Sequence, residues 1–306
     1  MRIRNWYTSA MQEIVKKIIE QEFNTQATSV EEIVGKGKNN LVFKIATETG
    51  IYILRLRNSQ EELETYQKEK RCADVAKNAG IPTPEILSVG VCGEYAFSIQ
   101  GYIEGTQGMG AKESVSEIWH TLGKYAKIFN QIPAPELTFN YTPFLQALFV
   151  EDFFTSRNIF SQEVSTKIQN RLEETIEWEF LPTLCHGNLH PSNVILSVDG
   201  VVHLIDWETS TGNRTPQSEL AEIYTWNTGK ENVAHFLAGY GLKEDAVEAM
   251  MRDIQTLVLL RLVDVIRRKV VKGEVWKVDT YIQETAKRLA EIQDYQEDIL
   301  FTKNLV

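Results

Sequence analysis

The spacing of hydrophobic positions changes character near residue 105. Before that point, short segments rich in β-branched and aromatic residues predict strands at 30–34, 41–46, 51–57, 85–90 and 94–100. Apolar residues recur at helical intervals at 11–22, and a second helix is expected at about 59–78. The first third of the chain therefore predicts a small antiparallel sheet accompanied by helices.

Beyond residue 105 the apolar spacing is almost wholly helical. Residues 115–129 keep close to the i, i+3, i+4, i+7 pattern, which predicts one buried helix face. Helices are expected at 112–131, 142–157, 163–179, 218–228, 233–240, 244–271 and 275–299. A doubly wound sheet would alternate strand and helix throughout, so this order favours an α+β fold with a sheet lobe followed by a mainly helical lobe.

One hairpin interrupts the helical part and carries most of the polar chemistry. Residues 185–208 read CHGNLHPSNVILSVDGVVHLIDWE, and the Asp-Gly between two β-prone segments is a strong hairpin signal. The hairpin puts Asn193 just before its first strand and Asp206 just after its second, so both side chains are expected at the same end. Two such oxygen donors suit Mg²⁺ that also holds substrate phosphates. The segment thus predicts the phosphoryl-transfer centre of a kinase.

Composition narrows the class of protein. The chain has 306 residues, enough for one large or two moderate domains, and its net charge of −10 argues against a nucleic-acid binder. The cysteines at 72, 92 and 185 are widely spaced without a Cys-x-x-Cys pair, which favours reduced thiols in the cytoplasm over disulfides or a zinc site.

No membrane segment is expected. Residues 10–23 are amphipathic and do not form the continuous apolar core of a signal peptide. The most apolar stretch, 254–266, is interrupted by Arg261 and Asp264 and is too short to span a bilayer. A buried helix is the better interpretation of that stretch.

Residues 186–193 resemble the catalytic loop of the aminoglycoside phosphotransferase and choline kinase family, small-molecule kinases with a protein-kinase-like two-lobe fold. The kinase template has a catalytic Asp, four intervening residues, a metal-binding Asn and a downstream metal-binding Asp. Asn188 and Asn193 have that spacing, and Asp206 occupies the downstream position. The resemblance implies that Asn193 and Asp206 hold Mg²⁺ and that His186 is the loop histidine, with a structural hydrogen-bonding role favoured over acid–base chemistry.

Asn188 departs from the family, which usually has Asp there. An amide cannot accept the hydroxyl proton of a substrate, and loss of a general base typically costs on the order of 10²- to 10⁴-fold in rate. Phosphoryl transfer depends mainly on positioning and charge neutralisation, so Asn188 could still orient a hydroxyl. Three interpretations stay open: an engineered variant inactivated to trap substrate, a natural slow kinase, or a nucleotide-binding pseudokinase.

The resemblance also implies phosphate-binding residues in the first third. The loop 35–40 joins two strands, and its Gly35, Gly37, Lys38 and Asn39 are expected to cover the phosphates. It is neither a Walker A loop nor a complete G-x-G-x-x-G motif, and a plain hairpin turn is the alternative. Arg55 stands where kinases have the strand cation that contacts the α- and β-phosphates, and Glu69 is its expected partner. A surface Arg and a solvated Glu are the competing interpretation.

Two lobes and a linker follow from these expectations. Residues 1–100 form the nucleotide-binding lobe, 101–105 resemble the interlobe linker, and 106–306 form the helical lobe with catalytic loop and acceptor site. Main-chain groups near Tyr102 and Ile103 are expected to contact the adenine edge. A glycine-rich loop at a domain boundary is the simpler alternative for the linker.

The expected activity is transfer of the γ-phosphate of ATP or GTP, with Mg²⁺, to a hydroxyl of a small molecule. The alternative is a catalytically impaired pseudokinase that binds nucleotide without efficient turnover. A protein-substrate kinase is disfavoured because no A-P-E element follows Asp206. The acceptor could be cationic, such as an aminoglycoside attracted by an acidic run, although a solvated helix face explains that run equally well: Glu284, Glu291, Asp294, Glu297 and Asp298.

Other polar residues near the loop have open roles. His190 is the only obvious substitute base for position 188. Glu208 could face the metal or only solvate the strand end. Glu219 lies where the family usually has an Asp that braces the catalytic loop, so a supporting role is favoured.

Overall fold

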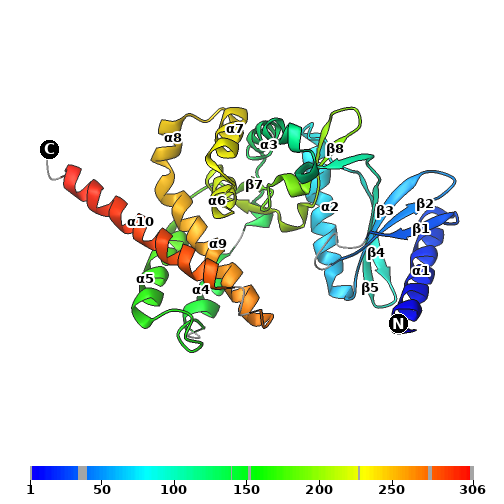
Figure 1. The fold of residues 1–306 in the computed structure, drawn as a ribbon, viewed down its shortest axis with the longest axis horizontal. Coiled ribbons are helices and arrows are strands. Elements are labelled where there is room, and N and C mark those ends of the chain that lie inside the picture. Colours follow the sequence, from blue (N-terminus) through cyan, green and yellow to red (C-terminus); the bar gives the residue numbers. More distant parts are fainter. Residues whose placement is uncertain are drawn as a thin grey trace. The chain divides into compact units, whose positions relative to one another are not determined.

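The computed structural model describes residues 2–33, 40–138, 140–150, 153–226, 228–274 and 278–303. The chain divides into two compact units (Figure 1). The first contains Met1–Ile118 and Pro191–Ser210, and the second contains Trp119–His190 and Thr211–Val306. The lobe boundaries expected from the sequence, 1–100, 101–105 and 106–306, stay a prediction.

The first unit is built on a five-stranded sheet with the order β1-β2-β3-β5-β4, in which all neighbouring strands are antiparallel. The expected antiparallel sheet is therefore confirmed. The strands are β1 (Ser29–Glu32), β2 (Leu41–Ala46), β3 (Ile51–Arg57), β4 (Ile86–Cys92) and β5 (Tyr95–Gly101).

Two helices flank this sheet, and the two faces of β3 differ in chemistry. The helix α1 (Arg2–Phe23) packs Val15, Ile18 and Ile19 against a core that includes Leu54 and Leu56 of β3. Because side chains alternate along a strand, the intervening Arg55 and Arg57 point to the other face. The helix α2 (Leu63–Asn78) supplies their partners there.

A second sheet of the first unit contains the expected hairpin. It has the order β6-β8-β9, with β6 (Gly105–Gln107), β8 (Val194–Ser197) and β9 (Val202–Leu204). Gly200 lies in the turn between β8 and β9 with a φ of 83°, which a glycine adopts without strain. β6 was not expected, because a strand of three residues leaves no periodicity to detect.

The second unit is mainly helical. A two-stranded antiparallel sheet of β7 (Thr183–Cys185) and β10 (Thr211–Asn213) lies among its helices. The helices are α3 (Val115–Phe129, whose first turn belongs to the first unit), α4 (Tyr141–Leu145), α5 (Gln162–Glu173), α6 (Gln217–Thr225), α7 (Lys230–Tyr240), α8 (Glu244–Ala249), α9 (Met251–Val271) and α10 (Asp279–Lys303).

The helix α9 is the centre of this unit, as its hydrophobic sequence suggests. It packs against α6 and α10, and ten of its side chains are buried. The single helix expected at 244–271 is divided at Met250 into α8 and α9, without a glycine or proline to signal the break. None of the helices in the described part of the chain is both long and apolar enough to cross a membrane.

Two glycines allow α3 and α7 to approach closely. A Cβ at Gly123 would collide with the carbonyl oxygen of Phe236, and a Cβ at Gly239 would collide with that of His120. We therefore expect Gly123→Ala to destabilise the protein by about 1–3 kcal/mol, since the clash is with rigid backbone. Chemical denaturation measures this loss. Gly101→Ala is the matched control, because nothing lies within 4 Å of a Cβ there, and equal midpoints for the two variants would contradict the prediction.

Candidate active site

The two expected metal ligands lie at the same end of the β8–β9 hairpin. Asn193 ends a short 3₁₀ turn just before β8, and Asp206 follows β9 after one residue. The backbone N–H of Ile205 donates to the carbonyl oxygen of Asn193 at 2.9 Å, which ties the two chain segments at this end. The hairpin therefore has the geometry expected from the sequence.

Asp206 has a conformation that is uncommon for a residue with a side chain. Its φ of 69° and ψ of 60° place it in the left-handed region. Asp tolerates this region better than most residues, yet such backbone is often found at functional positions. The turn directs the Asp206 carboxylate to within 3.7 Å of the Arg55 guanidinium.

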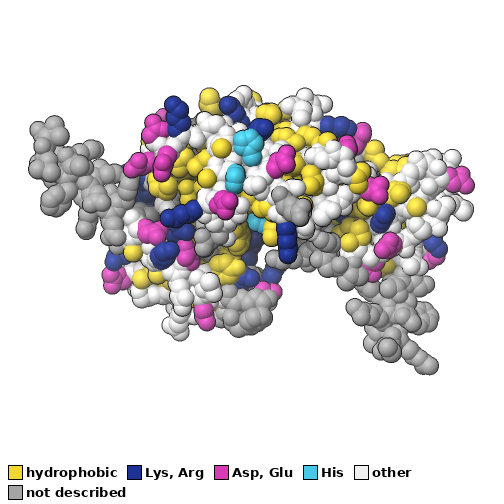
Figure 2. Space-filling model, turned by 45° about the horizontal axis from the view of Figure 1, so that its top comes forward, with side chains coloured by type: hydrophobic (Ala, Val, Ile, Leu, Met, Phe, Trp, Pro, Cys, Tyr) yellow, Lys and Arg dark blue, Asp and Glu magenta, His cyan; other side chains and the backbone are white. Residues whose placement is uncertain are grey.

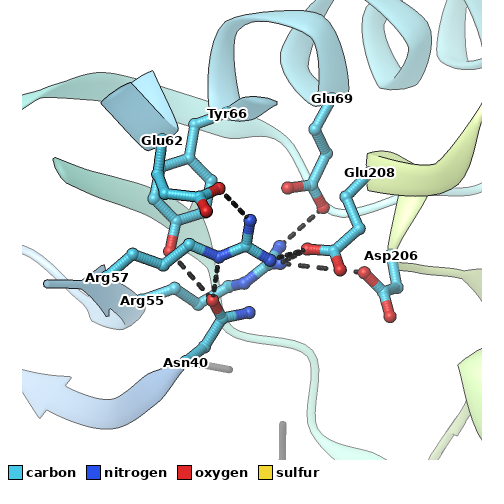
Figure 3. A network of polar contacts seen from close by, with 8 residues as sticks. All are labelled: Asn40, Arg55, Arg57, Glu62, Tyr66, Glu69, Asp206 and Glu208. Atoms are coloured by element: carbon cyan, nitrogen blue, oxygen red, sulfur yellow. Dashed lines mark hydrogen bonds and ion pairs between the residues drawn. The ribbon is translucent and has the colours of Figure 1, made fainter. Parts of the chain in front are cut away.

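Arg55 lies in a cluster of carboxylates (Figure 3). Its Nη1 donates to Glu69 Oε1 at 2.5 Å, and its Nη2 donates to Glu208 Oε2 at 3.1 Å. The ion pair that the resemblance implied between Arg55 and Glu69 is thus present. Both side chains are buried, with residue exposures of 8% and 1%, so the alternative of a surface Arg and a solvated Glu is wrong.

Arg57 is a second buried arginine of this site, and the sequence did not reveal its role. Its Nη2 donates to the same Glu208 oxygen at 2.5 Å, and its Nη1 donates to Glu62 Oε2 at 2.5 Å. Its Nε donates to Asn40 Oδ1, which also accepts from the Tyr66 hydroxyl at 3.3 Å (Figure 3). The sequence feature that could have revealed this role is the alternation of side chains along β3, which puts Arg57 on the same face as Arg55.

The charges of this cluster shift the titration of its members. Burial alone would lower the pKa of Arg55, but Glu69 and Asp206 outweigh burial and hold that pKa above its ordinary value. Burial raises the pKa of Glu69, against the opposing charge of Arg55. Burial and the neighbouring Asp206 carboxylate raise the pKa of Glu208 in the same way. Both arginines are therefore permanently charged, whereas Glu69 and Glu208 bind protons more readily than exposed glutamates do.

The residues at the hairpin end fit a divalent cation. The side chains drawn in Figure 3 include two arginines and four carboxylates, which with full ionisation leaves an excess of two negative charges. Asp206 Oδ1 is buried and accepts no hydrogen bond within the described part of the chain. The Arg55 guanidinium lies 3.7 Å from this oxygen, an ion pair without a hydrogen bond, so a closer cation would further compensate the burial of the charge. Mg²⁺ accepts oxygen ligands of the kinds that Asn193 and Asp206 carry.

Residues 186–190, which precede the hairpin, belong to the second unit. Glu219 of the same unit accepts a hydrogen bond from this segment. His186 is fully buried, and its backbone N–H donates to Glu219 Oε1 at 2.6 Å. The Nδ1 of His186 accepts from the backbone N–H of Asn188 at 3.3 Å. These contacts agree with the structural role favoured for His186 and with the supporting role favoured for Glu219.

His190 packs edge-on against Trp119, with ring centroids 5.6 Å apart. Burial lowers the pKa of His190, with a smaller opposing effect from Glu222. The imidazole is therefore mostly neutral at pH 7, the form that can accept a proton. Whether it substitutes for a carboxylate at position 188 stays a prediction.

Glu219 makes the stability of the protein depend on pH. Burial raises the pKa of its carboxyl from 4.5 to about 7, against opposing hydrogen bonds from Cys185 and His186 and the charge of Arg261, while Glu222 adds to the rise. The folded state thus binds a proton more tightly than the unfolded chain. This stabilisation is present below pH 4.5 and is lost as pH rises to about 7.

We expect Glu219→Gln to remove this pH dependence. Relative to the variant, the parent protein should lose up to about 3 kcal/mol of unfolding free energy between pH 4.5 and pH 7. Denaturant titrations at several pH values measure the difference. A constant difference across this window would show that Glu219 has an ordinary pKa.

The remaining expected site residues are placed as follows. Gly35, Gly37, Lys38 and Asn39 lie outside the described residues. The backbone N–H of Tyr102 donates to Ile51 at 3.2 Å, so an adenine contact at Tyr102 would use its carbonyl oxygen. Contacts of Tyr102 and Ile103 with a base stay predictions.

Comparisons with known proteins agree with the fold. The model of the phosphotransferase enzyme family matches residues 31–252. A search among curated proteins gives no match. The crystal structure of aminoglycoside phosphotransferase APH(4)-Ia is similar at a TM-score of 0.68 and 16% identity, covering 91% of this chain and 98% of that one. The GDP and kanamycin complex of APH(2")-IIia has a TM-score of 0.65 and 15% identity, covering 91% and 98%.

A third similar structure is spectinomycin phosphotransferase APH(9)-Ia with ADP and spectinomycin, at a TM-score of 0.63 and 14% identity, covering 92% and 93% of the two chains. At these identities the structures establish the fold, which is the protein-kinase-like α+β fold of aminoglycoside kinases. The family match covers most of the chain, from β1 through the β8–β9 hairpin to the start of α9. The chain belongs to the phosphotransferase enzyme family.

Proposed function

We propose that this protein is a nucleotide- and Mg²⁺-dependent phosphotransferase that transfers the γ-phosphate to a hydroxyl of a small molecule. The observation that carries the proposal is the Asp206 carboxylate, whose buried oxygen accepts no hydrogen bond from the described residues and lies 3.7 Å from Arg55. A cation and a triphosphate would satisfy both groups. Family membership and the Arg55–Glu69 ion pair support the same function.

Each residue has a defined task in this proposal. Asn193 and Asp206 would hold Mg²⁺, which supplies neutralisation of the phosphate charge. Arg55, oriented by Glu69, contacts the α- and β-phosphates. The loop with Gly35, Gly37, Lys38 and Asn39 covers the phosphates, while main-chain groups near Tyr102 and Ile103 contact the adenine. In this proposal, residues of the first unit stabilise the negative charge of the phosphates.

Position 188 has the task of orienting the acceptor hydroxyl. The side-chain oxygen of Asn188 can accept a hydrogen bond from that hydroxyl, but it cannot take the proton. This one substitution favours a second candidate function, a pseudokinase that binds nucleotide without efficient turnover. The two candidates share the nucleotide site and differ only in transfer.

The acceptor class is less constrained than the nucleotide site. Among the described side chains of the acidic run, Glu284 and Glu291 both contact Arg288, and Glu291 also lies 3.8 Å from Lys287. On the face shown in Figure 2, acidic side chains are interspersed with lysines and arginines. An aminoglycoside stays one candidate acceptor, supported by the ligands of APH(2")-IIia and APH(9)-Ia, but these neutralised glutamates weaken the electrostatic argument for it.

Two measurements in sequence test the proposal. Calorimetry with ATP and with GTP, each with and without Mg²⁺, should show metal-dependent binding. Transfer of labelled phosphate to a panel of aminoglycosides, sugars and small alcohols should then identify an acceptor. Binding without transfer would favour the pseudokinase, and the absence of nucleotide binding would reject both candidates.

A further inference from the structure

The two arginines of β3 share one carboxylate oxygen. Glu208 Oε2 accepts from Arg57 at 2.5 Å and from Arg55 at 3.1 Å (Figure 3). Arg57 has the shorter contact, and Arg55 has the longer one. Glu208 is therefore bound mainly by Arg57, with Arg55 as a second donor.

Two of the three guanidinium nitrogens of Arg55 already serve carboxylates. Its Nη1 donates to Glu69, and its Nη2 serves both Glu208 and Asp206. A phosphate that binds at Nη2 therefore competes with Glu208 for this nitrogen. If Arg55 were the sole partner of Glu208, its departure would be strongly unfavourable, because the largely buried carboxylate would keep an uncompensated charge.

Arg57 resolves this conflict. We propose that Arg57 is a positioning residue that retains Glu208 as an ion-pair partner and so releases Arg55 to bind the nucleotide phosphates. This inference rests on the proposed nucleotide site and adds a residue to it. Arg57 itself acts through Glu208 and does not contact the phosphates.

The other contacts of Arg57 suit this task. Glu62, which immediately precedes α2, and Asn40, which immediately precedes β2, accept hydrogen bonds from two further nitrogens of the guanidinium. The Tyr66 ring lies 5.4 Å from the guanidinium carbon of each arginine. Arg57 is thus held by groups other than Glu208 and does not have to move when Arg55 does.

A double-mutant cycle on nucleotide binding tests the proposal. Mg²⁺–nucleotide affinity is measured by calorimetry for the parent protein, Arg57→Gln, Glu208→Gln and the double variant. Arg57→Gln should weaken binding about tenfold, equivalent to ~1.4 kcal/mol, because Arg55 must then stay with Glu208. In the Glu208→Gln background the same exchange should change affinity by less than about twofold. An equal loss in both backgrounds, or no loss in the parent, would overturn the proposal.

The cycle separates this proposal from simpler explanations. If Arg57 attracted phosphates by its charge alone, its removal would weaken binding in both backgrounds. Arg171→Gln is the matched control, because Arg171 is also a buried arginine paired with a glutamate, Glu174, but belongs to the second unit. Its loss should lower the melting temperature without changing nucleotide affinity. No binding by the parent protein would reject the proposed function, whereas binding without coupling would reject only the role of Arg57.

Two further variants test the proposal if Arg57→Gln does not fold. Arg57→Lys keeps the charge beside Glu208 and should bind nucleotide within about threefold of the parent. Glu208→Gln frees Arg55 directly, so it should raise the affinity for nucleotide in the absence of Mg²⁺ by at least about threefold. Unchanged or weaker metal-free binding by Glu208→Gln would show that Glu208 does not compete for Arg55.

Discussion

Asn188→Asp is expected to increase the rate of phosphate transfer by roughly 10²- to 10⁴-fold. The exchange restores a carboxylate that can accept the proton of the acceptor hydroxyl. It should leave the fold intact, because the group at position 188 that contacts His186 is the backbone N–H. Nucleotide affinity should therefore change little, and the effect should appear in kcat.

Steady-state transfer assays with and without acceptor measure this effect. Asn140→Asp is the matched control, because it adds the same charge at an exposed helix cap. An active parent that Asn188→Asp does not accelerate would contradict a base at position 188. In that case His190→Gln should abolish transfer. Inactivity of both forms with every acceptor would instead favour the pseudokinase.

Asp206→Asn is expected to remove the Mg²⁺ dependence of nucleotide binding and to lower turnover on the order of 10²- to 10³-fold. Turnover is best measured in the Asn188→Asp background, where the rate is higher. Asn has the shape of Asp and tolerates the left-handed backbone of residue 206, so the exchange removes charge with little strain. Calorimetry with and without Mg²⁺ measures the binding effect.

Asp199→Asn provides the control at the other end of the same hairpin. Asp199 is exposed in the turn, and Asn-Gly forms such turns as readily as Asp-Gly. This control should bind nucleotide and Mg²⁺ like the parent protein. Undiminished Mg²⁺ dependence in Asp206→Asn would mean that the metal lies elsewhere.

The sequence predicted the elements that have a strong local signal. The strands β2 and β3 have the residue ranges expected from their β-branched and aromatic residues, and the Asp-Gly turn located the hairpin that carries Asn193 and Asp206. The partner of Arg55 was predicted by resemblance to a family motif. Local propensity and motif spacing were thus sufficient to predict the strands, the hairpin and the ion pair that make up the site.

The roles of Arg57 and Glu208 were not predicted from the sequence. These residues are separated by 151 positions, and no local pattern indicates that they meet. Their contact depends on how the hairpin packs against the sheet, which is a property of tertiary structure. The division of the helix at Met250 was missed because the sequence has no glycine or proline there to mark the break.

The first unit is built from two separate segments of the chain, and this constrains how it can fold during synthesis. Residues Pro191–Ser210 supply two strands of its second sheet and two of the carboxylates that pair with Arg55 and Arg57, those of Asp206 and Glu208. Translation must therefore proceed through Ser210 before this unit can be completed. A nascent chain ending at Ile118 would hold two desolvated guanidinium groups with only part of their counter-charge, and it should stay a substrate for chaperones and proteases until the hairpin emerges.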